Sequence, residues 1–173
     1  MQREIKFRGK RIDNGEWVYG MPYSFKPFWD SKKDELSILI FNPKWDLEAQ
    51  YNYLSNPVNF AHLEDSVWKV IPESVGQYTG QKDKNGQASY QDDIIRVEDY
   101  INDGINFCVI EWWKGKGQFG LKRYKMITKD GKVFTGEIID CGFRFEDVKM
   151  ETLEIIGNLI DNPELKELDT TKK

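Results

Sequence analysis

Five acidic residues close together in the middle of the chain form the first group that could do catalytic chemistry. They are Asp83, Asp92, Asp93, Glu98 and Asp99. Neighbouring carboxylates bind divalent cations, so this group could serve a nuclease or another phosphoryl-transfer enzyme. Asp83 also opens a short Asp-x-Asn-Gly segment, but the other ligands of a calcium loop are absent and two lysines flank it. A solvated turn leading into an acidic strand is the simpler interpretation, so we expect no metal and no other cofactor.

A second group is basic and aromatic. Between Trp112 and Lys132 the chain has seven cations against the single acid Asp130, a net charge of +6. The residues that could bind nucleic acid are Lys114, Lys116, Lys122, Arg123, Lys125, Trp112 and Trp113. Cations that neutralise phosphates, mixed with aromatic rings on which bases stack, are typical of single-strand binders. Strand alternation places Lys122 and Arg123 on opposite faces, so the whole set cannot share one surface.

The acidic segment 137–169, with a net charge of −7, supplies an alternative use for these cations. The opposite charges could pair within the fold or across a homo-oligomer, and then no nucleic acid would bind. The net charge of the whole chain is −4, too acidic for a general polyanion binder.

A third group is aromatic and lies in the N-terminal part. It contains Trp17, Tyr19, Tyr23, Phe25, Phe28, Trp29 and Trp45, interrupted by Pro22, Pro27 and Pro43. A groove for a proline-rich peptide has this composition. A loop held to the core by large side chains has it too, and we favour that reading because each ring buries a large area.

Nucleophilic catalysis finds little support. The chain has one histidine, His62, and no Gly-x-Ser-x-Gly or phosphate-binding glycine loop. Its two cysteines, Cys108 and Cys141, lie in apolar stretches without the spacing of a zinc site and are interpreted as small core side chains. A disulfide between them stays open.

Composition predicts a mostly β fold. Among 173 residues, Ile, Val and Thr number 31, aromatic residues make up 14% and Ala occurs only three times. β-Branched and aromatic side chains suit a pleated sheet. The N-terminus has no signal-peptide pattern and the longest apolar run, Ile38–Phe41, is too short to span a membrane, so we expect a cytoplasmic protein.

Alternation and turn residues predict the individual strands. The expected strands are 3–8, 16–19, 36–41, 66–71, 76–79, 93–97, 105–113, 118–124, 132–135, 137–140 and 153–160. Asn14-Gly15 predicts a tight hairpin, and Gly157 a bulge or a close backbone approach. Residues 162–168 carry the start signals of a short helix. Short strands at this spacing suggest a small barrel or sandwich.

Three segments together resemble the YopX family of phage and prophage proteins. They are residues 3–8, residues 77–95 from Gln77-Tyr78-Thr79-Gly80 to Asp92-Asp93-Ile94-Ile95, and residues 155–165. The resemblance implies a Src-homology-3-like β-barrel, an origin in phage or prophage genomes and no catalytic residues. In place of the family's Gly-Asp-Ile-Val this chain has Asp92 at the glycine position.

We therefore expect a mostly β protein with a Src-homology-3-like barrel, N-terminal hairpins and a short C-terminal helix. Residues 1–74 would pack on a barrel core of residues 75–168, followed by a frayed tail, 169–173. The expected function is binding without catalysis, as a phage-type accessory protein whose partner is nucleic acid or a nucleic-acid-associated protein, and as a homo-oligomer. The alternatives are a metal-dependent, nuclease-like enzyme using the acidic group and a purely structural homo-oligomer.

Overall fold

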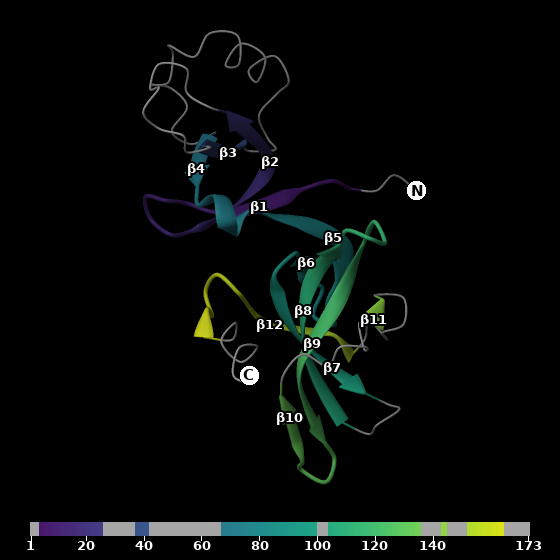
Figure 1. The fold of residues 1–173 in the computed structure, drawn as a ribbon. Helices are drawn as coiled ribbons and strands as arrows, with labels where there is room; N and C mark the ends of the chain where they lie inside the picture. Colours follow the sequence, from purple (N-terminus) through teal and green to yellow (C-terminus); the bar gives the residue numbers. More distant parts are fainter. Residues whose placement is uncertain are drawn as a thin grey trace, which may run out of the picture. The chain divides into compact units, whose positions relative to one another are not determined.

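Antiparallel strands dominate the computed structural model, which describes residues 4–25, 37–41, 67–99, 104–135, 143–144 and 152–164. This confirms the mostly β prediction. The chain divides into two compact units, Met1–Gln77 and Tyr78–Lys173, whose strands are labelled in Figure 1. In the described part of the chain, no helix has the length and apolar character needed to cross a membrane.

The first unit is an antiparallel sheet with the strand order β4-β3-β2-β1-β5. Its elements are β1 (Phe7–Lys10), β2 (Trp17–Phe25), β3 (Ser37–Phe41), β4 (Val67–Val70), the 3₁₀ turn η2 (Pro72–Ser74) and the first residues of β5 (Gly76–Lys82). Val18 and Val70 form a buried cluster in this unit, with Trp68 and Val75 packed against them. Ser74 fastens β1 to the 3₁₀ turn, since its Oγ accepts the Lys10 N–H at 2.7 Å.

The Asn14-Gly15 hairpin forms as predicted between β1 and β2, but its turn is longer than a two-residue turn. The Arg11 N–H donates to the Glu16 carbonyl at 2.8 Å, and the Gly15 N–H to the Arg11 carbonyl at 3.2 Å. Only Gly15 takes a positive φ, +73°. One left-handed glycine at the end of a four-residue turn therefore reverses the chain, rather than two left-handed residues.

The second unit is built on a long antiparallel sheet with the order β10-β9-β8-β7-β12. Its strands are β7 (Asp93–Asp99), β8 (Gly104–Trp113), β9 (Gln118–Thr128), β10 (Val133–Thr135) and β12 (Glu154–Asn158). β11 (Phe143–Arg144) also pairs with β9, and β6 (Ala88–Tyr90), which the sequence did not predict, pairs with the end of β5.

Both faces of this sheet bury apolar residues. One face carries the main cluster, made of Ile95, Val97, Cys108, Ile110, Phe119, Leu121 and Leu153. The other face buries Ile94, Val109 and Tyr124, with Phe107 and Leu159 beside them. Two-sided burial explains why β7 and β8 have apolar neighbours in sequence instead of strict alternation.

The predicted closed barrel is not what the described strands form. β10 and β12 are the two ends of the sheet, and no described pairing joins them. On the outer side of β12, the Asp83 carboxylate accepts the Ile155 N–H at 3.3 Å, and just before the strand the Lys84 N–H donates to the Leu153 carbonyl at 2.9 Å. The predicted helix at 162–168 is described only as far as Glu164, and the strand predicted at 137–140 lies outside the described residues.

The backbone at Gly157 matches the sequence prediction, and Asp92 is a second special position. The register between β12 and β7 shifts between Ile155 and Gly157, which confirms the bulge, and Ile156 is left half exposed. A Cβ at Gly157 would meet the Asn162 side chain, so the close approach is also present. Asp92 has φ of 65° and is the one non-glycine residue with positive φ among those described.

Candidate nucleic-acid interface

The acidic group does not form a cation site in the described part of the chain, where no three His, Cys, Asp or Glu residues are placed to hold a metal. Asp83 is buried and accepts backbone N–H bonds from Asn85 and Gln87, both at 2.8 Å, and from Ile155 at 3.3 Å. Burial raises the pKa of Asp83, but the bonds from Gln87, Ile155 and Asn85 outweigh it and leave the pKa below its usual value. The Asp83 carboxylate therefore joins a turn to β12 by hydrogen bonds, a structural role.

The other acids of the group are separated by their surroundings. Asp93 is buried and accepts the Tyr90 N–H at 2.8 Å. The Asp92 backbone makes two hydrogen bonds of 2.9 Å: its N–H donates to the Ile110 carbonyl, and its carbonyl accepts the Leu159 N–H. Glu98 is exposed, and the Asp99 side chain lies outside the described residues.

The basic segment forms one hairpin, in which β8 and β9 are joined by a turn at residues 114–117. Directly paired residues share a face of the sheet. Cys108 pairs with Arg123 and Val109 with Lys122, so Arg123 and Lys122 point to opposite faces. Arg123 is buried, and its guanidinium donates to the Asn106 Oδ1 at 3.1 Å. The structure thus removes Arg123 from the candidate surface.

A β-bulge returns Lys125 to the face of Lys122. The register shifts between Phe107 and Cys108, which leaves Tyr124 as the extra residue and pairs Lys125 with Phe107. The Lys125 Nζ lies 5.3 Å from the centre of the Phe107 ring. Without the bulge, a spacing of three residues would put Lys122 and Lys125 on opposite faces.

We name this face of the hairpin, together with its turn, the lysine face. Its cations are Lys114, Lys116, Lys122 and Lys125. Glu111 is the only acid in β8 or β9, and its Oε1 lies 4.0 Å from the Lys122 Nζ. Such a partly exposed pair contributes at most about 1 kcal/mol and leaves the face positive.

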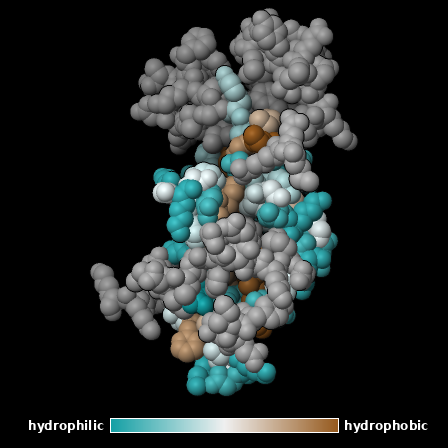
Figure 2. Space-filling model, turned by 90° about the vertical axis from the view of Figure 1, so that its right-hand side faces the viewer, coloured by the Kyte–Doolittle hydropathy of each residue, from teal (hydrophilic) through white to brown (hydrophobic). Residues whose placement is uncertain are grey.

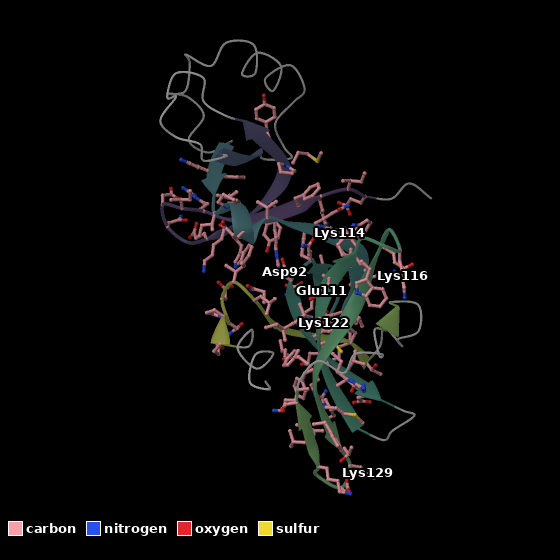
Figure 3. All side chains as sticks on the ribbon, viewed as in Figure 1. Asp92, Glu111, Lys114, Lys116, Lys122 and Lys129 are labelled. Carbon is pink, nitrogen blue, oxygen red and sulfur yellow. The ribbon has the colours of Figure 1, made fainter. Side chains whose placement is uncertain are left out.

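The remaining cations lie at the far end of the hairpin. Figure 3 shows Lys114 and Lys116 at the turn, Glu111 and Lys122 along the strands and Lys129 beyond the other end of β9. A strand of 11 residues separates the two ends by about 35 Å. At that end the Lys132 Nζ lies 2.7 Å from the Asp130 carboxylate. The seven cations are therefore two groups and a buried arginine, not one patch.

The two candidate tryptophans also point to opposite faces. Trp112 pairs with Phe119 and packs edge-on against it, with ring centres 5.0 Å apart, and is 39% exposed. Trp113 pairs with Gln118 on the lysine face, and the Lys116 Nζ lies 4.6 Å from its ring centre. Only Trp113 can share a ligand with the lysines.

Three residues of the interface were missed from the sequence. Phe107 and Glu111 contact its lysines, and Gly120 lies under the Trp113 ring. The register alone brings them there, and a one-residue bulge that sets the register leaves no clear signal in the sequence.

The N-terminal aromatic group is only partly described. On β2, Tyr19 and Tyr23 are 48% and 42% exposed, and the Arg8 guanidinium lies 4.5 Å from the centre of the Trp17 ring. The side chains of Phe25, Phe28, Trp29 and Trp45 lie outside the described residues.

Of the possible nucleophiles, Cys108 is a buried member of the main core, as predicted. Burial first, and then the neighbouring Cys108, raise the pKa of Tyr124 to about 12, so this tyrosine stays protonated at neutral pH. His62 and Cys141 lie outside the described residues.

Comparison with known families matches a family model described as YopX protein to residues 6–167, nearly the whole chain. The chain belongs to the YopX family. No curated protein matches it. In this YopX chain Asp92 has a left-handed φ of 65°, a conformation that glycine adopts more readily than other residues.

Proposed function

We propose that this YopX protein is a phage-type accessory protein of the cytoplasm that acts by binding, without catalysis, and that single-stranded nucleic acid is its ligand. The observation that carries the proposal is the lysine face, where Lys122 and Lys125 follow one strand and Lys114 and Lys116 continue from it into the turn. An extended strand of cations suits an extended chain of phosphates.

Aromatic contacts support this reading because they hold two of the lysines in place without neutralising them. Lys116 lies over Trp113 and Lys125 over Phe107. A cation–π contact leaves the ammonium charge intact, unlike an ion pair. Figure 2 shows one face of the molecule, on which the coloured residues are mostly hydrophilic and the apolar ones form small patches.

The test is fluorescence anisotropy with labelled oligonucleotides at low salt. Lys122→Ala/Lys125→Ala should weaken binding of a single strand about tenfold or more, because each lysine lost removes a phosphate contact. The matched control, Lys129→Ala/Lys132→Ala, removes the same charge at the far end of the hairpin and should change the affinity much less.

Equal losses in both double variants would show that net charge, not the lysine face, drives binding. Absence of binding by the wild type at low salt would overturn the nucleic-acid proposal. A nucleic-acid-associated protein with an acidic surface would then be the remaining partner for these lysines.

Self-association is a second candidate, favoured by β10. This end strand of the sheet exposes Val133 (55%) and Phe134 (48%) on opposite faces. An uncharged apolar strand at a sheet edge is a template for pairing with another copy. Sedimentation equilibrium should show a dimer that Phe134→Lys dissociates, while the control Ile156→Lys, at a similarly exposed position on β12, leaves it intact. A monomeric wild type would remove this candidate.

A further inference from the structure

A neighbouring side chain, and not the backbone conformation of Gly120, requires glycine at position 120. Its φ is not in the left-handed region, so its backbone would accept any residue. A Cβ built at this position, however, would fall on the Trp113 indole, against the atoms Cε2, Cζ2 and Cδ2. The ring therefore lies flat on the backbone of β9 at a position where only glycine leaves room.

The register shows how the ring reaches this place. Trp113 pairs with Gln118, whereas Gly120 pairs with Glu111. The indole thus crosses diagonally from β8 to β9, a reach that large aromatic side chains can make. One ring face is backed by Gly120, and the Lys116 Nζ lies over the ring at 4.6 Å from its centre.

We propose that Trp113 is a preformed stacking platform for an unpaired base and that Lys116 covers it until a ligand arrives. This inference rests on the proposed function and specifies how the lysine face recognises its ligand. When a base stacks on the indole, the Lys116 ammonium moves from the ring to a phosphate. Trp112 cannot take this part, because it lies on the other face with its ring against Phe119.

Replacing the Lys116 contact on the Trp113 ring by a stacked base favours ligand binding, because stacking is the stronger of the two interactions. An exposed cation–π contact changes an equilibrium about two- to fivefold. Stacking a base on an aromatic side chain changes it about 5- to 150-fold. Lys116 also regains a partner, because the ammonium that leaves the ring meets a phosphate. A platform of this kind selects single strands, since the bases of a duplex remain in their own stack.

The experiment compares three labelled probes of about ten nucleotides: an oligothymidine, a duplex of the same length and an abasic strand with the same phosphates. The wild type should bind the oligothymidine at least about fivefold more tightly than the abasic strand. Trp113→Leu should remove this preference and leave the affinity for the abasic strand unchanged, whereas Trp113→Phe should keep most of it.

Gly120→Ala should reduce the preference for bases without altering any charge, because the added methyl displaces the ring. Gly115→Ala is its control, since a Cβ there meets nothing within 4 Å. Binding of oligothymidine should also quench tryptophan fluorescence, and the quenching should shrink in Trp113→Phe. The quenching measurement uses only the wild type and Trp113→Phe, so it tests the stacking platform even if Gly120→Ala destabilises the fold.

The outcomes separate this inference from the proposed function. If the wild type binds none of the probes, the proposed function fails and the platform with it. If the wild type binds all three equally and Trp113→Leu behaves like it, the lysine face binds phosphates and the stacking platform alone is overturned. A base preference that survives Trp113→Leu would place the stacking site elsewhere and would also contradict the inference.

Discussion

Replacing Asp83 by alanine tests whether the acidic group is structural. The Asp83 Oδ1 accepts the N–H groups of Asn85 and Gln87 at 2.8 Å, and Oδ2 accepts the Ile155 N–H and the Asn85 amide at 3.3 Å. A hydrogen bond to a charged group contributes about 1.5–3 kcal/mol. Counting only the two short bonds, at the low end of that range, Asp83→Ala should lower the free energy of unfolding by about 3 kcal/mol.

Thermal and urea unfolding give the measurement. For a chain of this length, that loss corresponds to a fall in Tm of about 6–12 °C. Asp83→Asn keeps an acceptor oxygen and should lose less. The control Glu98→Ala removes an exposed acid of the same group and should stay within about 0.5 kcal/mol of the wild type.

The dependence on pH has a defined sign. The pKa of Asp83 is lower in the folded chain than its usual value near 3.9. Its stabilisation is therefore complete above about pH 4 and is lost as the pH falls through the folded pKa. The difference between wild type and Asp83→Ala should shrink below pH 4. Unchanged stability of Asp83→Ala would refute the structural role of the Asp83 carboxylate. A magnesium-dependent rise in Tm that this variant abolishes would also refute it and favour a cation site.

Two further predictions concern special backbone positions. Asp92→Gly should change the free energy of unfolding by about 0.5 kcal/mol or less, because glycine accepts the left-handed φ. Asp92→Val should lower it by about 2 kcal/mol, because a β-branched residue at positive φ is strained. Urea unfolding that shows equal stability for the two variants would contradict the left-handed conformation of Asp92. Gly157→Val should lower stability by about 1–2 kcal/mol, because the new side chain displaces Asn162, whose Oδ1 accepts the Asn158 N–H at 3.3 Å. An unaltered thermal midpoint in Gly157→Val would disprove the close approach.

Local signals in the sequence located the turns and most strands. Asn14-Gly15 marked the first hairpin, and the Gly157 bulge followed from two isoleucines that alternation could not place on one face. Glycine and β-branched residues favour particular conformations of their own backbone, so turns and strands that depend on them can be predicted from a single sequence. The edge of β12 was different. Its closing partner is a side chain, Asp83, and strand alternation says nothing of such a partner.

The candidate site was predictable in composition but not in arrangement. Alternation separated Lys122 from Arg123, yet it could not show that the bulge at Tyr124 brings Lys125 to the side of Lys122. It also gave no sign that Arg123 is buried. Both outcomes depend on register, because a shift of one residue exchanges the two faces of a strand.

The salt dependence of binding to a single-stranded oligonucleotide tests the central claim most directly. Each phosphate contact on a single strand contributes about −0.7 to the log–log slope of the binding constant against salt concentration. The four lysines of the lysine face therefore predict a slope of about −3 between about 50 and 200 mM salt. Lys122→Ala/Lys125→Ala should reduce the slope by about half, while Lys129→Ala/Lys132→Ala leaves it close to that of the wild type. A wild type without measurable affinity at 50 mM salt, or a slope that the lysine-face variant does not change, would contradict the account.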